Sequence, residues 1–146
     1  MSHESPRLII PALGPVYGGL HDWAYTLLRV VAGICLMVHG WPKIQNPMGA
    51  INLVESLGFY PGALWSPLLA GTEFIGGLLI AIGLLTRPAA LAGTFVLLVT
   101  VWFHWVTKGE GFSGAEKSIL WAAMTFYIFI AGPGRHSVDR AIGKSF

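Results

Sequence analysis

The chain has 146 residues, of which 54% are hydrophobic and 11% charged, with a mean hydropathy of +0.65 and a net charge of +2. Soluble domains carry about 25% charged residues, so this composition excludes an ordinary water-soluble domain and predicts a polytopic membrane protein. The low net charge and the lack of a basic run argue against a nucleic-acid partner. The single cysteine, Cys35, excludes an intrachain disulfide, a CxxCH haem attachment and a thiolate metal cluster.

The first twenty residues are interrupted by Pro6, Pro11 and Pro15, with glycines beside them. They hold no uninterrupted apolar core and no cleavage-like site, so we do not expect a secretory signal. We expect residues 1–20 to form an irregular arm that partly rests on the membrane surface.

Four apolar segments follow, each long enough to be a membrane-spanning helix. Short connections between them predict an all-α, antiparallel four-helix bundle that forms a single membrane domain over residues 1–146. We expect a short surface helix near residues 48–57, ended by Gly58, and a tight turn at residues 86–88 with Pro88 as a first helical residue. The expected spans are residues 22–42, 63–85, 89–105 and 115–132, and residues 133–146 form a tail.

The distribution of lysine and arginine predicts the orientation. Five cationic residues lie on the side of the two termini and three on the other side, which places both termini in the cytoplasm of a bacterial inner membrane. The first group is Arg7, Arg87, Arg135, Arg140 and Lys144, and the second is Lys43, Lys108 and Lys117.

Ionisable residues inside the spans converge on one end of the predicted bundle. Antiparallel crossing brings His39, Glu73, His104 and Glu116, with Lys117 beside it, into the extracytoplasmic half. Arg29 lies about 6 to 8 Å in depth from Glu73 at about 1.5 Å per residue, so we expect a buried Arg29–Glu73 ion pair.

Each of these residues also has a purely structural explanation. The Arg29–Glu73 pair could fix helix register, although charges within a span are functional by default. His39 and His104 could sit at the headgroup level, and Glu116 could simply favour a helix N-terminus. We expect Cys35 to be a small buried hydrophobic residue.

Histidines and carboxylates beside lipid suit the head group of a quinone, whose carbonyls need donors and whose reduction needs protons. Two histidines on different helices could also clamp a b-type haem, but His39 and His104 need not face each other, so haem is not expected. A carboxylate-bridged metal site is not expected either, because the Glu-x-x-His spacing is absent.

Several motifs resemble the DoxX family of small four-helix membrane proteins. They are LLRVVAGICLMVHGWPK (27–43), ESLGFYP (55–61), LLAGTEFIGGLLIAIGLLTRPAAL (68–91) and GPGRHSVD (132–139), and the resemblance extends over residues 27–139. The resemblance implies that the residues of the family's motifs correspond here to Arg29, His39, Lys43, Glu73, Gly76, Gly77 and Arg87.

Relatives in this family include the membrane part of a thiosulfate:quinone oxidoreductase, so the resemblance implies a quinone-facing subunit of a redox system, with a partner subunit or a second copy. We expect Glu73 and His104 to handle protons, and Arg29, His39, Lys43 and Glu116 to contact the head group. The alternatives are a non-enzymatic accessory subunit that packs through Gly76, Gly77 and Gly83, and a small lipid or solute carrier.

Overall fold

The computed structural model describes residues 8–145, and all regular secondary structure within them is helical, as the sequence predicts. The elements, in chain order, are η1 (Pro11–Leu13), α1 (Gly14–Gln45), α2 (Ile51–Ser56), α3 (Gly62–Gly71), η2 (Thr72–Gly76), α4 (Gly77–Ile82), α5 (Thr86–Trp102), η3 (Phe103–Thr107), α6 (Gly111–Ala131) and α7 (Val138–Ala141).

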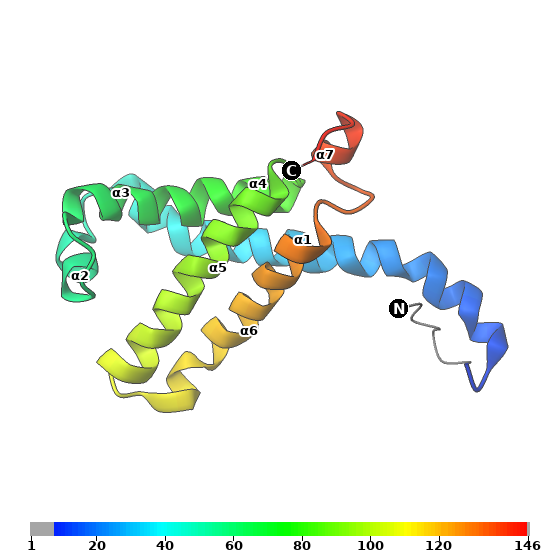
Figure 1. The fold of residues 1–146 in the computed structure, drawn as a ribbon, viewed down its shortest axis with the longest axis horizontal. Helices are drawn as coiled ribbons and strands as arrows, with labels where there is room; N and C mark the ends of the chain where they lie inside the picture. Colours follow the sequence, from blue (N-terminus) through cyan, green and yellow to red (C-terminus); the bar gives the residue numbers. More distant parts are fainter. Residues whose placement is uncertain (1–7, 146) are drawn as a thin grey trace.

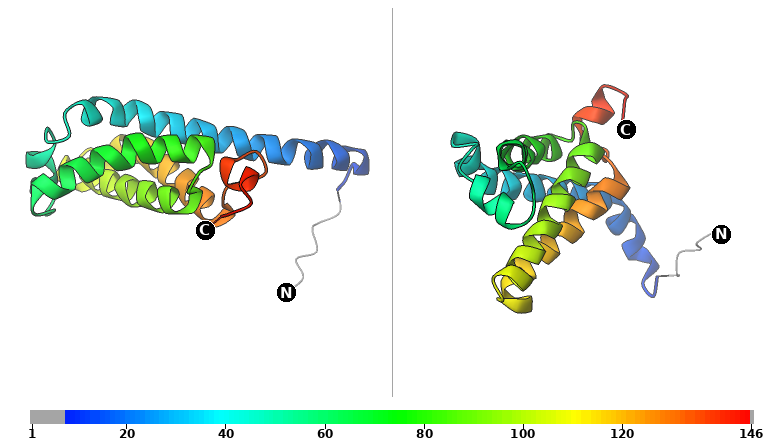
Figure 2. Two further views of the ribbon diagram at one scale, coloured as in Figure 1. Left: turned by 90° about the horizontal axis from the view of Figure 1, so that it is seen from above. Right: turned by 60° about the vertical axis from the view of Figure 1, so that its left-hand side comes forward.

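The long helices form two antiparallel pairs (Figure 1). Segments α3, η2 and α4 run as one helix beside α1, and α5 with η3 runs beside α6. The two pairs lie close together where α4 turns into α5, and they diverge toward the end that carries α2 and the α5–α6 turn (Figure 2).

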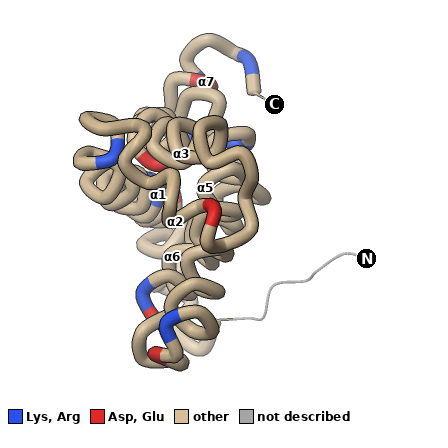
Figure 3. The backbone as a smooth tube through the Cα atoms, turned by 90° about the vertical axis from the view of Figure 1, so that its left-hand side faces the viewer, with Lys and Arg blue, Asp and Glu red and all other residues tan. Residues whose placement is uncertain are grey.

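Three helical segments within residues 8–145 are long and apolar enough to cross a membrane: Pro11–Gln45, Gly62–Ile82 and Thr86–Thr107. Helix α6 has 21 residues, which is sufficient length, but Glu116 and Lys117 near its start reduce its hydropathy. The fourth membrane span therefore stays a prediction. Figure 3 shows that most of the backbone is free of charged residues, as expected for helices in lipid.

Helix α1 is longer than the span predicted at residues 22–42, because it begins at Gly14. The prediction of an irregular arm was wrong for residues 14–20; residues 1–7 of that arm lie outside the described part of the chain. Pro15 is compatible with the helix because the first turn leaves its backbone N–H groups unpaired in any case. Helix α5 likewise begins earlier than predicted, at Thr86, so Pro88 lies within its first turn.

Glycines let α1 approach both η2 and α4 closely. A Cβ atom on Gly33 would lie 2.5 Å from the carbonyl oxygen of Gly77, and one on Gly40 would lie 2.5 Å from the backbone nitrogen of Phe74. Gly77, predicted to lie on a packing face, thus packs within the chain. The adjoining core consists mainly of small and aliphatic side chains, including Ala32, Leu36, Ile80, Ala90, Leu97 and Ile128.

Candidate functional site

The space between the two helix pairs is a groove of about 970 Å³. Its walls are apolar and aromatic, with Phe59 and Trp65 on one side and Phe95 and Trp121 on the other. Cys35 also lines it and is exposed, so the prediction of a buried cysteine was wrong. The ionisable residues that line the groove are His39, Lys43, Glu73, His104 and Lys117.

Glu73 is 7% exposed and forms an ion pair with Lys43, near the C-terminal end of α1. The same ammonium group donates a hydrogen bond to the carbonyl oxygen of His39 at 3.3 Å. Lys43 is thus held by a carboxylate and a carbonyl at the groove wall, and the buried charge of Glu73 is compensated as a low-dielectric setting requires.

Both residues expected to handle protons lie in π-helical segments. Glu73 belongs to η2, and His104 belongs to η3. A π-helical turn adds a residue to the helical repeat and changes which side chains face a neighbour, and such turns are frequent at functional sites. Sequence periodicity alone could not place these two side chains, because it assumes 3.6 residues per turn.

The two histidines enter the groove from different helices. The His39 ring contacts Trp121 edge-on, with 5.0 Å between ring centroids. His104 Nδ1 lies 2.6 Å from a carboxylate oxygen of Glu110, and Lys108 lies 3.3 Å from the other oxygen. The hydrogen bond from His104, followed by that from Lys108, lowers the pKa of Glu110 and so favours the ionised form of this carboxylate.

Arg29 lies elsewhere, and the predicted Arg29–Glu73 ion pair was wrong. Its guanidinium donates hydrogen bonds to the carbonyl oxygens of Ile80 at 2.7 Å, Ala81 at 2.8 Å and His136 at 2.6 Å. Arg29 and Lys43 are 14 residues apart on one helix, or about 21 Å, so the partner of Lys43 cannot also reach Arg29. Ile80 and Ala81 lie in the last turn of α4, where carbonyl groups carry partial negative charge and attract cations, and His136 lies in the segment before α7.

The C-terminal segment completes this second cluster. Asp139, 3% exposed, accepts hydrogen bonds from the backbone nitrogens of Leu85 and Thr86 and from the Thr86 hydroxyl. Burial raises the pKa of Asp139, but the hydrogen bonds from Thr86 and Leu85 outweigh burial and lower it overall. Arg29 and Asp139 therefore bind the two sides of the α4–α5 turn, and we call this pair the turn clamp.

The remaining predicted residue, Glu116, is exposed and does not line the groove, whereas its neighbour Lys117 does. Within residues 8–145 no group of three or more His, Cys, Asp and Glu side chains is arranged to hold a metal ion. Sequence reasoning missed the aromatic walls from Trp65 and Trp121. Trp121 gave one signal, because it lies inside a predicted span, whereas Trp65 lies at the start of its span and is indistinguishable from an interfacial aromatic residue.

Comparison with known proteins identifies the family of this chain. The DoxX family model matches residues 24–105. The chain is 33% identical to the inner membrane protein YqjF of Escherichia coli, over 87% of this chain and 98% of that protein. It is 24% identical to the inner membrane protein YphA of the same organism, over 85% and 94% respectively.

The chain is also 41% identical to CatD of Bacillus subtilis, over 49% of this chain and 52% of that protein. CatD is named as a candidate oxidoreductase. No match was found among solved structures. The family match extends over more than half of the chain and includes most of α1 together with α3, α4 and α5: this protein belongs to the DoxX family of membrane proteins.

Proposed function

We propose that this protein is the quinone-binding membrane subunit of a redox system. The observation that carries the proposal is the groove itself, which joins long apolar walls to a cluster of ionisable side chains at its wider end. Ligand sites of this kind are mostly apolar, with a few polar groups that fix orientation.

The side chains in the groove fit both parts of an isoprenoid quinone. Phe59, Phe95 and aliphatic residues from α1 and α5 offer a surface for the isoprenoid tail. The head group has carbonyl oxygens that need hydrogen-bond donors, and His39, Lys43 and His104 carry such donors. The donor set therefore suits a quinone better than a purely apolar lipid.

A bound quinone would supply a couple that accepts two electrons and two protons. In this chain, Glu73 holds the Lys43 ammonium at the groove wall, and His39 and His104 supply imidazole groups, a type of side chain that often serves in general acid–base catalysis. Glu110, which does not line the groove, orients the His104 ring through a hydrogen bond to Nδ1. The electron donor would belong to a partner subunit.

The accessory-subunit alternative loses one of its supports. It relied on glycines as a face for another protein, but Gly77 packs against α1 within the chain. Gly83 lies against Arg29 and Ser137, so it is also occupied.

The test is quinone binding by the purified protein in mild detergent. Bound lipid is extracted and analysed for quinone, and short-chain ubiquinone and menaquinone analogues are titrated while tryptophan fluorescence is followed, since Trp65 and Trp121 line the groove. We expect saturable binding that weakens about tenfold in Glu73→Gln, because Lys43 loses the charged partner that orients it.

The matched control is Glu116→Gln, which makes the same chemical change outside the groove and should bind as the wild type does. Equal quinone affinities of the wild type and Glu73→Gln would show that Glu73 does not contribute to quinone binding. An empty preparation that shows no saturable binding and retains a stable protein partner would refute the proposal in favour of an accessory subunit.

A further inference from the structure

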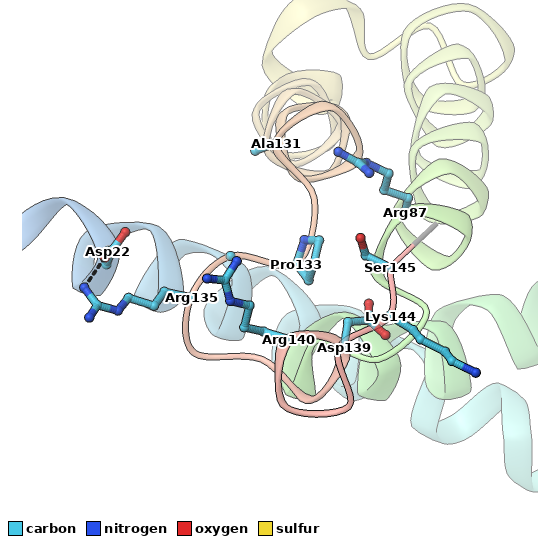
Figure 4. A pocket seen from close by; sticks show the side chains of 11 residues that line it. Asp22, Arg87, Ala131, Pro133, Arg135, Asp139, Arg140, Lys144 and Ser145 are labelled. Carbon is cyan, nitrogen blue, oxygen red and sulfur yellow. Dashed lines mark hydrogen bonds and ion pairs between the residues drawn. The ribbon is translucent and has the colours of Figure 1, made fainter.

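A second cavity, of about 730 Å³, lies at the end of the molecule opposite the wide end of the groove. It is formed where α1, the start of α5 and the end of α6 meet the C-terminal segment (Figure 4). Cationic side chains come from two of these parts: Arg87 from α5, and Arg135, Arg140 and Lys144 from the C-terminal segment.

The acidic residues of this cavity do not balance its cations. Asp139 is buried and engaged by Leu85 and Thr86, and Asp22 pairs with Arg135 at 3.3 Å. Within residues 8–145, the side chains of Arg140 and Lys144 have no hydrogen bond or ion pair. The cavity therefore carries excess positive charge that the described residues do not neutralise.

One cation is fixed in place. Arg87 donates hydrogen bonds to the carbonyl oxygens of Phe129 at 3.2 Å and Ile130 at 3.4 Å, which holds its guanidinium against the end of α6. Figure 4 shows the Arg87 and Arg140 side chains on either side of Pro133, with Arg135 on the α1 side. Guanidinium groups match the geometry of phosphate oxygens and bind them with paired hydrogen bonds.

The cavity also lies at the depth expected for lipid head groups. Ala131, which lines it, is the last residue of α6, and Arg87 is in the first turn of α5. Beside it, Ile130 (58% exposed) and Tyr127 (49% exposed) present apolar surface along α6. An anion in the cavity could thus carry acyl chains that continue along this surface, on the side predicted to face the cytoplasm.

We propose that this cavity binds a phosphate group, in the form of the phosphodiester of an anionic phospholipid. Basic cavities between helices on the cytoplasmic side are suited to such head groups, and each nearby cation adds to the attraction. The cavity is distinct from the groove, so this proposal does not depend on quinone binding.

The experiment uses the full chain in zwitterionic detergent, with bound lipid counted by native mass spectrometry. Short-chain phosphatidylglycerol, short-chain phosphatidylcholine and inorganic phosphate are titrated separately. We expect phosphatidylglycerol to bind more tightly than phosphatidylcholine, and its affinity to fall about fivefold for each of Arg140→Gln and Lys144→Gln and about 30-fold for both together.

Lys108→Gln is the matched control, since it removes one positive charge at the opposite end and should leave lipid affinity unchanged. Circular dichroism verifies that each variant keeps its helices. If inorganic phosphate competes with phosphatidylglycerol and shows the same loss in the double variant, the cavity recognises the phosphate and also accepts a soluble source. Equal binding of the two lipids, or an unchanged affinity in the double variant, overturns the proposal.

Discussion

Replacement of Arg29 by methionine tests the turn clamp most directly. The substitution keeps an unbranched side chain but removes three hydrogen bonds of 2.6 to 2.8 Å to the carbonyl oxygens of Ile80, Ala81 and His136. Charged hydrogen bonds contribute about 1.5 to 3 kcal/mol each. The substitution also removes the free-energy cost of burying a cation, which offsets part of this loss. We therefore expect Arg29→Met to lower the free energy of unfolding by about 3 kcal/mol.

The assay is unfolding by sodium dodecyl sulfate in mixed micelles, followed by circular dichroism. Arg135→Met is the control, because the Arg135–Asp22 ion pair is exposed and such pairs contribute at most about 1 kcal/mol.

A double-mutant cycle then separates the observed partners from the ion pair that the sequence predicts. Arg29→Met and Glu73→Gln should be additive within about 0.5 kcal/mol, because they lie in separate clusters. Lys43→Met and Glu73→Gln should show a coupling larger than about 1 kcal/mol. A coupling of that size between Arg29 and Glu73, with none between Lys43 and Glu73, would refute the assignment of partners.

Two further predictions concern packing and pH. Gly33→Ala should lower the free energy of unfolding by about 1 to 3 kcal/mol, because the added Cβ would meet the α4 backbone at 2.5 Å. The control is Gly18→Ala, where nothing lies within 4 Å, and it should be neutral or stabilising by up to about 1 kcal/mol. Equal effects of the two substitutions would contradict the close approach of α1 and α4. The folded-state pKa of Asp139 is lowered, so its stabilisation should be complete above about pH 4 and lost as pH falls through the folded-state value. The free energy of unfolding of Asp139→Asn should lack this pH-dependent contribution. A free energy of unfolding of the wild type that rises as the pH falls below about 4 would contradict the lowered pKa of Asp139.

Composition and hydrophobic segments were enough to predict the all-helical fold and the approximate positions of the spans. The sequence predicts too short a first span because Pro15 and the glycines after it interrupt the apolar pattern, although proline is compatible with the first turn of a helix. Depth along the helices predicted that His39, Glu73 and His104 lie at the same end of the molecule, and all three line the groove there.

The partners of the charged residues could not be predicted from the sequence. Depth along a helix placed Arg29 near Glu73, but contact also requires the two side chains to face each other around the helix axes, and the π-helical turn at η2 changes that direction for Glu73. Backbone carbonyls, which bind Arg29, have no sequence signature. The role of Asp139 depends on the path of the C-terminal segment, which a hydropathy pattern does not describe.

The turn clamp also has a consequence for the order in which the chain assembles. Leu85 has a φ of 48°, an unfavourable conformation for a side chain of this size, and it is held by a carboxylate from far along the sequence. Thr86 and Asp139 are 53 residues apart, so at ordinary rates of protein synthesis the turn precedes its clamp by roughly 3 to 10 s. Until Asp139 has been made, the backbone nitrogens of Leu85 and Thr86 lack this partner, so we expect the clamp to form only after α7 has been synthesised.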